Sequence, residues 1–222
     1  MAPARTAYLA LLAVAFGVVE AAVVVYLRVL GDPAGAGQTA FVLLPPGVLR
    51  LEMAREAATL VLLASAAALA AGSRVARTAA FLVLFGTWDI VYYVVLHLVL
   101  GWPARLTDWD VLFLLPVPWY APVYAPLLVA STMLGCGLVV LHEIRLRGGF
   151  VARRSHVAGV TAGALAIVAS FTVPGPRAVE QDAYWTVPLL GGEALGLVAF
   201  ADAWRRTRRL PGRPAEPDPQ GS

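Results

Sequence analysis

The sequence has little charge, a single cysteine and no lysine. Only 14% of its 222 residues are charged, whereas about 25% are charged in a typical soluble domain. The lone cysteine, Cys136, cannot form an internal disulfide, and its apolar surroundings are typical of a small buried residue. All 17 basic residues are arginine, and they cluster in particular connections, so the net charge of +3 does not predict a nucleic-acid partner. The low charge argues against a soluble protein.

Apolar residues are abundant instead: they make up 59% of the chain and form repeated long runs. A helix of about 20 residues crosses a hydrocarbon core about 30 Å thick. The runs are unbroken, so they lack the alternation of a transmembrane β-barrel. We therefore predict an all-α fold, a polytopic bundle of six transmembrane helices within the lipid bilayer. The predicted spans are Ala7–Leu30, Val48–Ala71, Ala79–Leu100, Trp119–Leu141, His156–Val173 and Pro188–Trp204.

The arginines outside these spans favour one side of the membrane. Apart from Arg5, which precedes span one, they follow spans two, four and six, whereas the alternate connections contain only Arg105 and Arg177. The positive-inside rule then places both termini in the cytoplasm, and we expect a multi-pass protein of the bacterial inner membrane. Residues 1–204 would form one transmembrane domain, and Arg205–Ser222, rich in Arg, Pro and Gly, is expected to be a disordered basic cytoplasmic tail. The arginines that set this orientation are Arg74, Arg77, Arg145, Arg147, Arg153, Arg154, Arg205, Arg206, Arg208, Arg209 and Arg213.

Glycines four residues apart occur in spans five and six, as Gly159 with Gly163 and Gly192 with Gly196. Small residues at this spacing let membrane helices approach closely. We expect close packing between these two spans or with another copy of the chain, which would make a homo-oligomer. Other membrane subunits are the alternative partners.

The apolar stretch before span four is interrupted by four prolines, Pro116, Pro118, Pro122 and Pro126. Proline lacks a backbone donor and clashes with the preceding helical turn. We predict a short re-entrant or interfacial segment over residues 111–118 on the outer side, with Asp108 or Asp110 capping its N-terminus. In a functional interpretation the segment forms one wall of an outward-facing cavity, as broken helices do in transporters. In a structural one it is a kink with aromatic anchors at the interface.

Acidic side chains lie within the spans, where each costs roughly 2.5–3.5 kcal/mol on insertion scales. The predicted orientation places all of them in the outer half of the membrane, with Arg55 as the one cation at similar depth. Asp89, Tyr93 and His97 follow one another at four-residue spacing and share a helix face. Glu52 and Glu56 have the same spacing. The acids are Glu20, Glu52, Glu56, Asp89 and Glu193.

If these faces and Glu20 share one interior, a single arginine cannot neutralise the carboxylates. The remaining acids must be protonated or must hold a cation, which is typical of proton relays and ion pathways. Alternatively, the acids form a structural polar network, in which Asp89 is neutral and bonded to Tyr92 or to a backbone carbonyl. The predicted ion- or proton-binding residues are Glu20, Glu52, Arg55, Glu56, Asp89 and Tyr93. A divalent metal is the possible cofactor, with Glu20, Glu56, Asp89 and His97 as its ligands.

Four stretches in the first part of the chain form a recognisable set: Glu20–Arg28, Arg55–Thr59, Trp88–Tyr93 and Trp109–Trp119. They resemble a group of small, uncharacterised multispan proteins of the bacterial inner membrane. The resemblance covers roughly the first 130 residues and implies an intact multispan membrane protein, without a substrate or an activity.

The leading functional prediction is a small transporter, or a subunit of a larger membrane system, that binds or conducts protons or a cation at an outward-facing site. A metal-dependent membrane enzyme acting on a lipid-like or periplasmic substrate is the first alternative. A structural or assembly subunit is the second. The chain has no Walker loop, no Gly-x-Ser-x-Gly and no His-Glu-x-x-His motif, so no sequence signature identifies a catalytic residue.

Overall fold

The computed structural model describes residues 3–31 and 45–209. Six helices in these ranges are long and apolar enough to cross a membrane, which confirms the predicted all-α polytopic bundle. A short hairpin and a short helix complete the described part. The elements are α1 (Pro3–Gly31), α2 (Pro46–Ala70), α3 (Arg74–Leu100), β1 (Trp109–Phe113), β2 (Trp119–Pro122), α4 (Tyr124–Arg147), α5 (Arg154–Thr172), α6 (Pro176–Glu180) and α7 (Thr186–Arg209).

Two predicted boundaries are corrected by the structure. The fourth long helix begins at Tyr124 rather than at Trp119, because the residues just before it pair as strand β2. The last helix continues to Arg209, so residues 205–209 are helical rather than part of a disordered tail. Residues 210–222, the rest of that predicted tail, lie outside the described residues.

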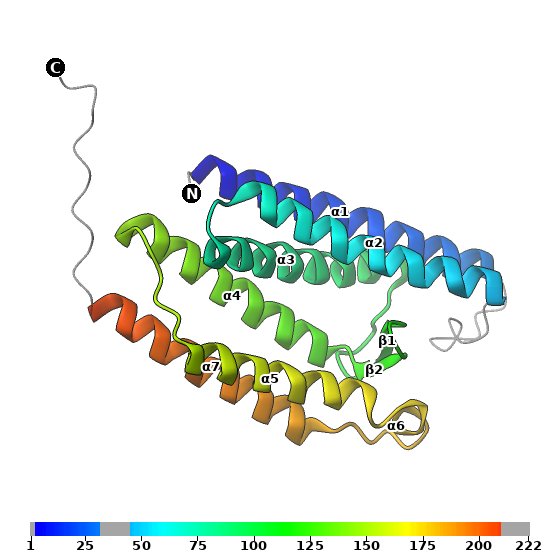
Figure 1. The fold of residues 1–222 in the computed structure, drawn as a ribbon. Coiled ribbons are helices and arrows are strands. Elements are labelled where there is room, and N and C mark those ends of the chain that lie inside the picture. Colours follow the sequence, from blue (N-terminus) through cyan, green and yellow to red (C-terminus); the bar gives the residue numbers. More distant parts are fainter. Residues whose placement is uncertain (1–2, 32–44, 210–222) are drawn as a thin grey trace.

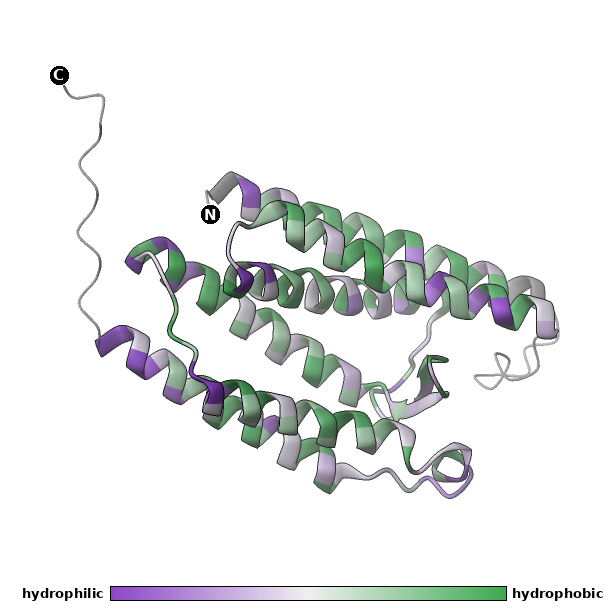
Figure 2. Ribbon diagram, in the orientation of Figure 1, coloured by the Kyte–Doolittle hydropathy of each residue, from purple (hydrophilic) through white to green (hydrophobic). Residues whose placement is uncertain are grey.

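The connections of the bundle alternate between two ends (Figure 1). The start of α1, the α2–α3 and α4–α5 connections and the end of α7 share one end. The hairpin and α6 lie at the other, which we call the hairpin end. Figure 2 shows mostly apolar helices, with a polar stretch where α7 ends. The arginine-rich connections therefore share the end opposite the hairpin.

Helix α3 is the central element of one group of helices. Its Leu84 packs with Leu63 of α2 and Leu9 of α1 in one cluster of buried side chains. On another face, its Val83 packs with Val140 of α4. These buried contacts hold α3 between its neighbours. In lipid they stabilise the bundle through close van der Waals packing, because the hydrophobic effect does not drive helices together there.

Helices α5 and α7 form a second, closely packed pair. A Cβ atom placed on Gly163 would lie 2.5 Å from the Gly192 carbonyl oxygen, so a side chain at this position would force the helices apart. The predicted close packing of these two glycine-containing spans is confirmed. Because Phe171 of α5 and Leu189 of α7 also pack with Ala121 and Ala125, the pair is attached to β2 and to the start of α4.

The proline-rich segment before α4 is an antiparallel hairpin. Asp110 pairs with Ala121 and Val111 with Tyr120, and an irregularity follows before Phe113 pairs with Trp119. The sequence predicted a short re-entrant or interfacial segment over residues 111–118, but not its pairing as strands. Asp108 accepts hydrogen bonds from the backbone of Ala104 and Arg105, at 2.7 and 3.0 Å. Because these residues precede it, Asp108 closes a turn instead of capping the segment that follows.

Two acidic side chains near the end opposite the hairpin are each held by two partners. Glu143 of α4 accepts hydrogen bonds from Arg147 and from the Trp204 indole, both at 2.8 Å. Asp202 of α7 lies 2.8 Å from both His156 Nε2 and Arg206 Nε. These contacts connect α4 to α7 and α5 to α7, so the acids at this end serve to join helices.

Candidate functional site

A cavity of about 400 Å³ lies between the two groups of helices and the hairpin. Its walls come from all six long helices and from both strands. Aromatic and aliphatic side chains make up most of the lining. The predicted site residues Glu20, Glu52, Arg55, Glu56, Asp89 and Tyr93 all line this cavity, so the structure brings them together.

Arg55 joins two of the acids into a compact ion cluster. Its guanidinium forms ion pairs with Glu20 of α1 and with Glu52 of α2. The Nε atom of Arg55 also donates to Glu52 at 2.9 Å, and Thr59 donates to Glu20 at 3.3 Å. Glu52 is only 5% exposed, so it is buried rather than solvated. Both carboxylates are therefore held by donors from α2, and this cluster joins α1 to α2.

Glu56 lies one turn further along α2 and attaches the hairpin to that helix. Its carboxylate accepts a hydrogen bond from the backbone nitrogen of Leu114 at 2.8 Å. Leu114 follows β1 directly, where the hairpin reverses. A backbone donor that the strand pairing leaves unused is thereby satisfied within the bundle.

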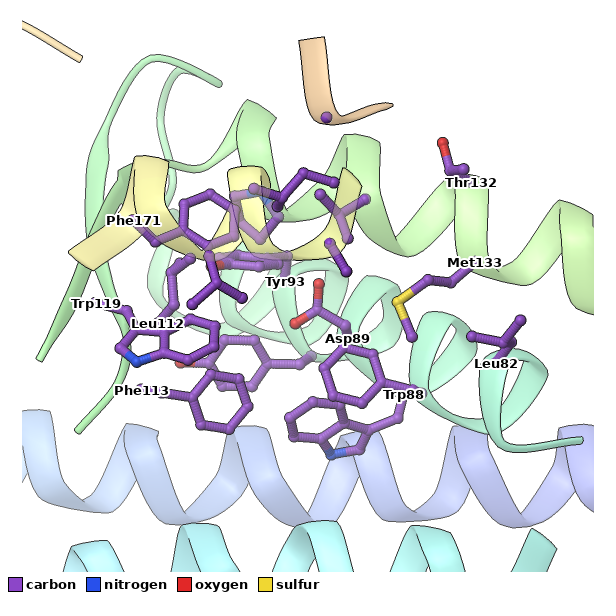
Figure 3. Close-up of a pocket in the computed structure, with 18 of the residues that line it drawn as sticks. Leu82, Trp88, Asp89, Tyr93, Leu112, Phe113, Trp119, Thr132, Met133 and Phe171 are labelled. Carbon is purple, nitrogen blue, oxygen red and sulfur yellow. The ribbon is translucent and has the colours of Figure 1, made fainter. Parts of the chain in front are cut away.

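Asp89 differs from the other cavity acids because it has no partner among the residues that the structure describes. Its side chain on α3 is 8% exposed, and within residues 3–31 and 45–209 no donor or cation contacts its carboxylate. Figure 3 shows the carboxylate pointing into the cavity, with Trp88 and Tyr93 nearby. A buried carboxylate without a donor is costly, and buried groups of this kind often mark sites of function.

Tyr93 continues the polar face of α3 toward the hairpin. Its hydroxyl donates to Asp110 of β1 at 2.9 Å, and Asp110 also lies 3.6 Å from the Arg28 guanidinium. Burial raises the pKa of Asp110 to about 6, while Arg28 and the Tyr93 hydroxyl act in the opposite direction. Asp110 thus belongs to a buried contact between α1, α3 and the hairpin and caps nothing.

Arg28 is a second cation at the hairpin contact, to which the sequence pattern assigned no role. It lies near the end of α1, and its guanidinium is 3.8 Å from the centre of the Trp102 ring. A cation over an aromatic face gains about 0.5–2 kcal/mol. Arg28 opposes Asp110 of β1 and does not line the cavity, so in the described part of the chain Arg55 is still the one arginine among the predicted cavity acids. No local pattern could have revealed this pairing, because Arg28 and Asp110 are far apart in the sequence.

The structure does not assemble the predicted metal ligands. His97 is exposed, contacts the Pro103 carbonyl oxygen at 2.8 Å through Nδ1 and does not line the cavity. In the described part of the chain, no group of three or more His, Cys, Asp or Glu side chains is arranged to hold a metal ion. His97 shares a helix face with Asp89 in the sequence pattern, but it lies two turns further along α3.

Glu193 of α7 brings a further acid to the opposite wall of the cavity. It is 7% exposed, and the Thr132 hydroxyl of α4 is its hydrogen-bond partner. The sequence predicted Glu193 in the same half of the membrane as the other acids, but could not show that α7 faces the same cavity as α3. Among the described residues, the cavity is therefore lined by five carboxylates, Glu20, Glu52, Glu56, Asp89 and Glu193, and by one arginine, Arg55.

The fold and this site define a multi-pass membrane protein with an acidic cavity inside its helical bundle. No protein-family model, curated protein or solved structure matches the chain. The resemblance to small multispan inner-membrane proteins stays a prediction.

Proposed function

We propose that this protein is a small membrane transporter, or a subunit of a larger membrane system, that binds protons or a cation at Asp89. The observation that carries the proposal is the Asp89 carboxylate, which is buried, faces a cavity of about 400 Å³ and has no partner among residues 3–31 and 45–209. In a low-dielectric surrounding such a group is stable only when a proton or another cation neutralises it.

The other acids of the cavity strengthen this preference for positive charge. Arg55 balances one of the two carboxylates that it contacts, so the cluster of Glu20, Arg55 and Glu52 keeps a net negative charge when both acids are ionised. Glu193 adds a further acid on the facing wall. Field lines are concentrated in clefts with apolar walls, so a cation entering the cavity is attracted while an anion is repelled.

The arginine distribution supports an orientation for the site. We place the arginine-rich end of the bundle, with both termini, in the cytoplasm of a bacterium, and the hairpin end on the outer side of its inner membrane. The cavity then lies in the outer half of the membrane, where the hairpin separates it from the aqueous phase. A cation from outside would reach Asp89 past the hairpin.

Some of the acids that line the cavity have contacts that suit a structural role. Glu56 holds the hairpin, and Glu20 and Glu52 are paired with Arg55. Asp89 has no partner in the described part of the chain, so the proposal rests on this residue and not on the whole acidic set. A purely structural or assembly subunit does not need an unpaired carboxylate in an open cavity.

Infrared difference spectroscopy tests whether Asp89 exchanges protons or cations. The purified full chain in lipid nanodiscs is titrated from acid to alkaline pH, with and without added monovalent cations, beside Asp89→Asn. We expect a carboxyl band in the wild type that shifts with pH or cation and is missing in Asp89→Asn. Asp202→Asn, an acid of α7 that does not line the cavity, serves as the matched control. Identical spectra of wild type and Asp89→Asn would refute the proposal.

The neighbouring groups must be considered in this titration, because each can contribute to the difference spectrum. The subtraction of Asp89→Asn isolates the band of one carboxyl group, provided that the other bands superimpose. The other ionisable groups that line the cavity are Glu20, Glu52, Arg55, Glu56, Tyr92, Tyr93, Cys136 and Glu193.

A further inference from the structure

The size of the cavity exceeds what a proton or a bare metal ion needs. Its volume is about 400 Å³, and a water molecule occupies about 30 Å³ in the liquid. Pockets for small organic molecules span about 300–1,000 Å³. An inorganic cation would be held by converging oxygen atoms, yet in residues 3–31 and 45–209 no group of acids and histidines is arranged for a metal. The dimensions fit an organic ligand better.

The apolar walls of the cavity are rich in aromatic rings from separate elements. The Phe113 ring lies 6.4 Å from Trp88 and 5.5 Å from Trp119, and Trp119 lies 6.0 Å from Phe171. These centroid distances form one continuous aromatic series from α3 across the hairpin to α5. The face of an aromatic ring carries partial negative charge, so it attracts cations while it also contacts apolar groups.

The unpartnered carboxylate points into the same space as these rings. Figure 3 shows Asp89 directed into the cavity, with Trp88 on one side and Phe113, Trp119 and Phe171 toward the hairpin. An ammonium group beside Asp89 would find a counter-charge, and an apolar body attached to it would lie against the rings. A carboxylate combined with aromatic faces is the usual recognition chemistry for substituted ammonium ions.

From these observations we infer that the ligand of this cavity is an amphipathic organic cation, with its positive group at Asp89 and its apolar part against Phe113, Trp119 and Phe171. The inference rests on the proposed function, because it requires that Asp89 accepts a cation. It goes beyond that function in naming the chemical class of the cation. An anion of the same shape is excluded by the carboxylates, and an inorganic ion leaves the aromatic walls without a role.

Three organic ions of known charge and shape test the inference on the purified full chain in neutral detergent. Benzyltrimethylammonium and tetraphenylphosphonium are cations of different size. Tetraphenylborate has the shape of the second cation and the opposite charge. Isothermal titration calorimetry measures the affinity of each. We expect saturable binding of at least one of the two cations and no saturable binding of tetraphenylborate.

Single variants then test whether cation binding depends on the Asp89 carboxylate and on the aromatic rings of the cavity. Asp89→Asn removes the counter-charge, and we expect it to raise the Kd of the bound cation by about 30-fold or more, as for other truncated buried charge pairs. Trp119→Leu keeps the charge and removes one ring that would contact the apolar part of the ligand, for which we expect a rise in Kd of about 10-fold. Asp202→Asn, outside the cavity, should bind as the wild type does. Size-exclusion profiles verify that each variant is folded.

The outcomes separate this inference from the proposed function. If neither cation binds, or if tetraphenylborate binds equally well, the organic-cation inference is overturned, even when the infrared band of Asp89 responds to protons. Cation binding that is unchanged in Asp89→Asn also overturns it. If the infrared band of Asp89 does not respond at all, the proposed function itself fails. If Asp89→Asn does not fold, two measurements still test the organic-cation inference. They are the comparison of the two tetraphenyl ions on the wild type and the change in Kd caused by Trp119→Leu.

Discussion

Buried acids occur toward both ends of the bundle, but their hydrogen-bond partners differ. Away from the hairpin, Glu143 is held by Arg147 and Trp204, and its contacts join α4 to α7. In the cavity near the hairpin, Asp89 has no partner in the part of the chain that the structure describes. The two side chains are almost equally buried, at 5% and 8% exposed. Burial alone therefore does not distinguish the two acids, whereas the hydrogen-bond donors around each carboxylate do.

The Arg55 cluster shows that the cavity contains structural acids as well, and its disruption should have the largest effect. Arg55→Leu leaves Glu20 and Glu52 without their shared cation. We expect a loss of about 3–5 kcal/mol in the free energy of unfolding, because removing one partner of a buried ion pair strands the other charge. Denaturant titration in detergent micelles measures this loss.

A double variant provides the control for that experiment. Adding Glu52→Gln to Arg55→Leu removes one of the stranded charges and should recover part of the lost stability. If Arg55→Leu is as stable as the wild type, the cluster does not join α1 to α2 and the contrast between paired and unpaired acids loses its basis.

Asp110 is buried and has partners, but its pKa is raised. Its contribution to the free energy of unfolding therefore depends on pH. Burial raises its pKa from 3.8 to about 6, so the folded protein binds this proton more tightly than the unfolded chain does. Between about pH 4 and 6 the native state therefore holds more protons, and the free energy of unfolding should fall as pH rises, by an amount on the order of 3 kcal/mol. Above this pH range, Asp110 causes no further fall in the free energy of unfolding. Unfolding measured at several pH values follows the decline.

Asp110→Asn does not titrate and should lack this decline, although it also weakens the contact with Arg28. The slope of stability against pH, and not the absolute stability, is therefore the quantity to compare. Parallel pH profiles of wild type and Asp110→Asn would mean that Asp110 does not titrate with a raised pKa.

The helices could be predicted from the sequence because their signals are local. Each long apolar run predicts one span, and the predicted and observed helices share most of their residues. The helical face shared by Glu52 and Glu56, and the one shared by Asp89 and Tyr93, follow from spacing alone. That these faces meet in one cavity was a hypothesis at that stage, and the structure places all four residues in its lining.

The contacts between distant segments could not be predicted in this way. Arg28 reaches Asp110, and Glu56 reaches the backbone of Leu114, across long stretches of chain. The prolines indicated a broken segment, but strand pairing depends on how the hairpin fits between α2, α3 and α5. His97 has the correct spacing from Asp89 and still lies outside the cavity, since helical spacing does not say where a lining ends.

The most direct test of the central claim compares the stability of two single variants, Glu143→Gln and Asp89→Asn. Each replaces a buried acid with its neutral amide. Glu143→Gln weakens charge-assisted hydrogen bonds and should lower the free energy of unfolding by about 1.5 kcal/mol. Asp89→Asn removes a charge without a partner, so its free energy of unfolding should equal or exceed that of the wild type at neutral pH. A loss in Asp89→Asn as large as that in Glu143→Gln would contradict the account, because it would make Asp89 a structural acid rather than a binding group.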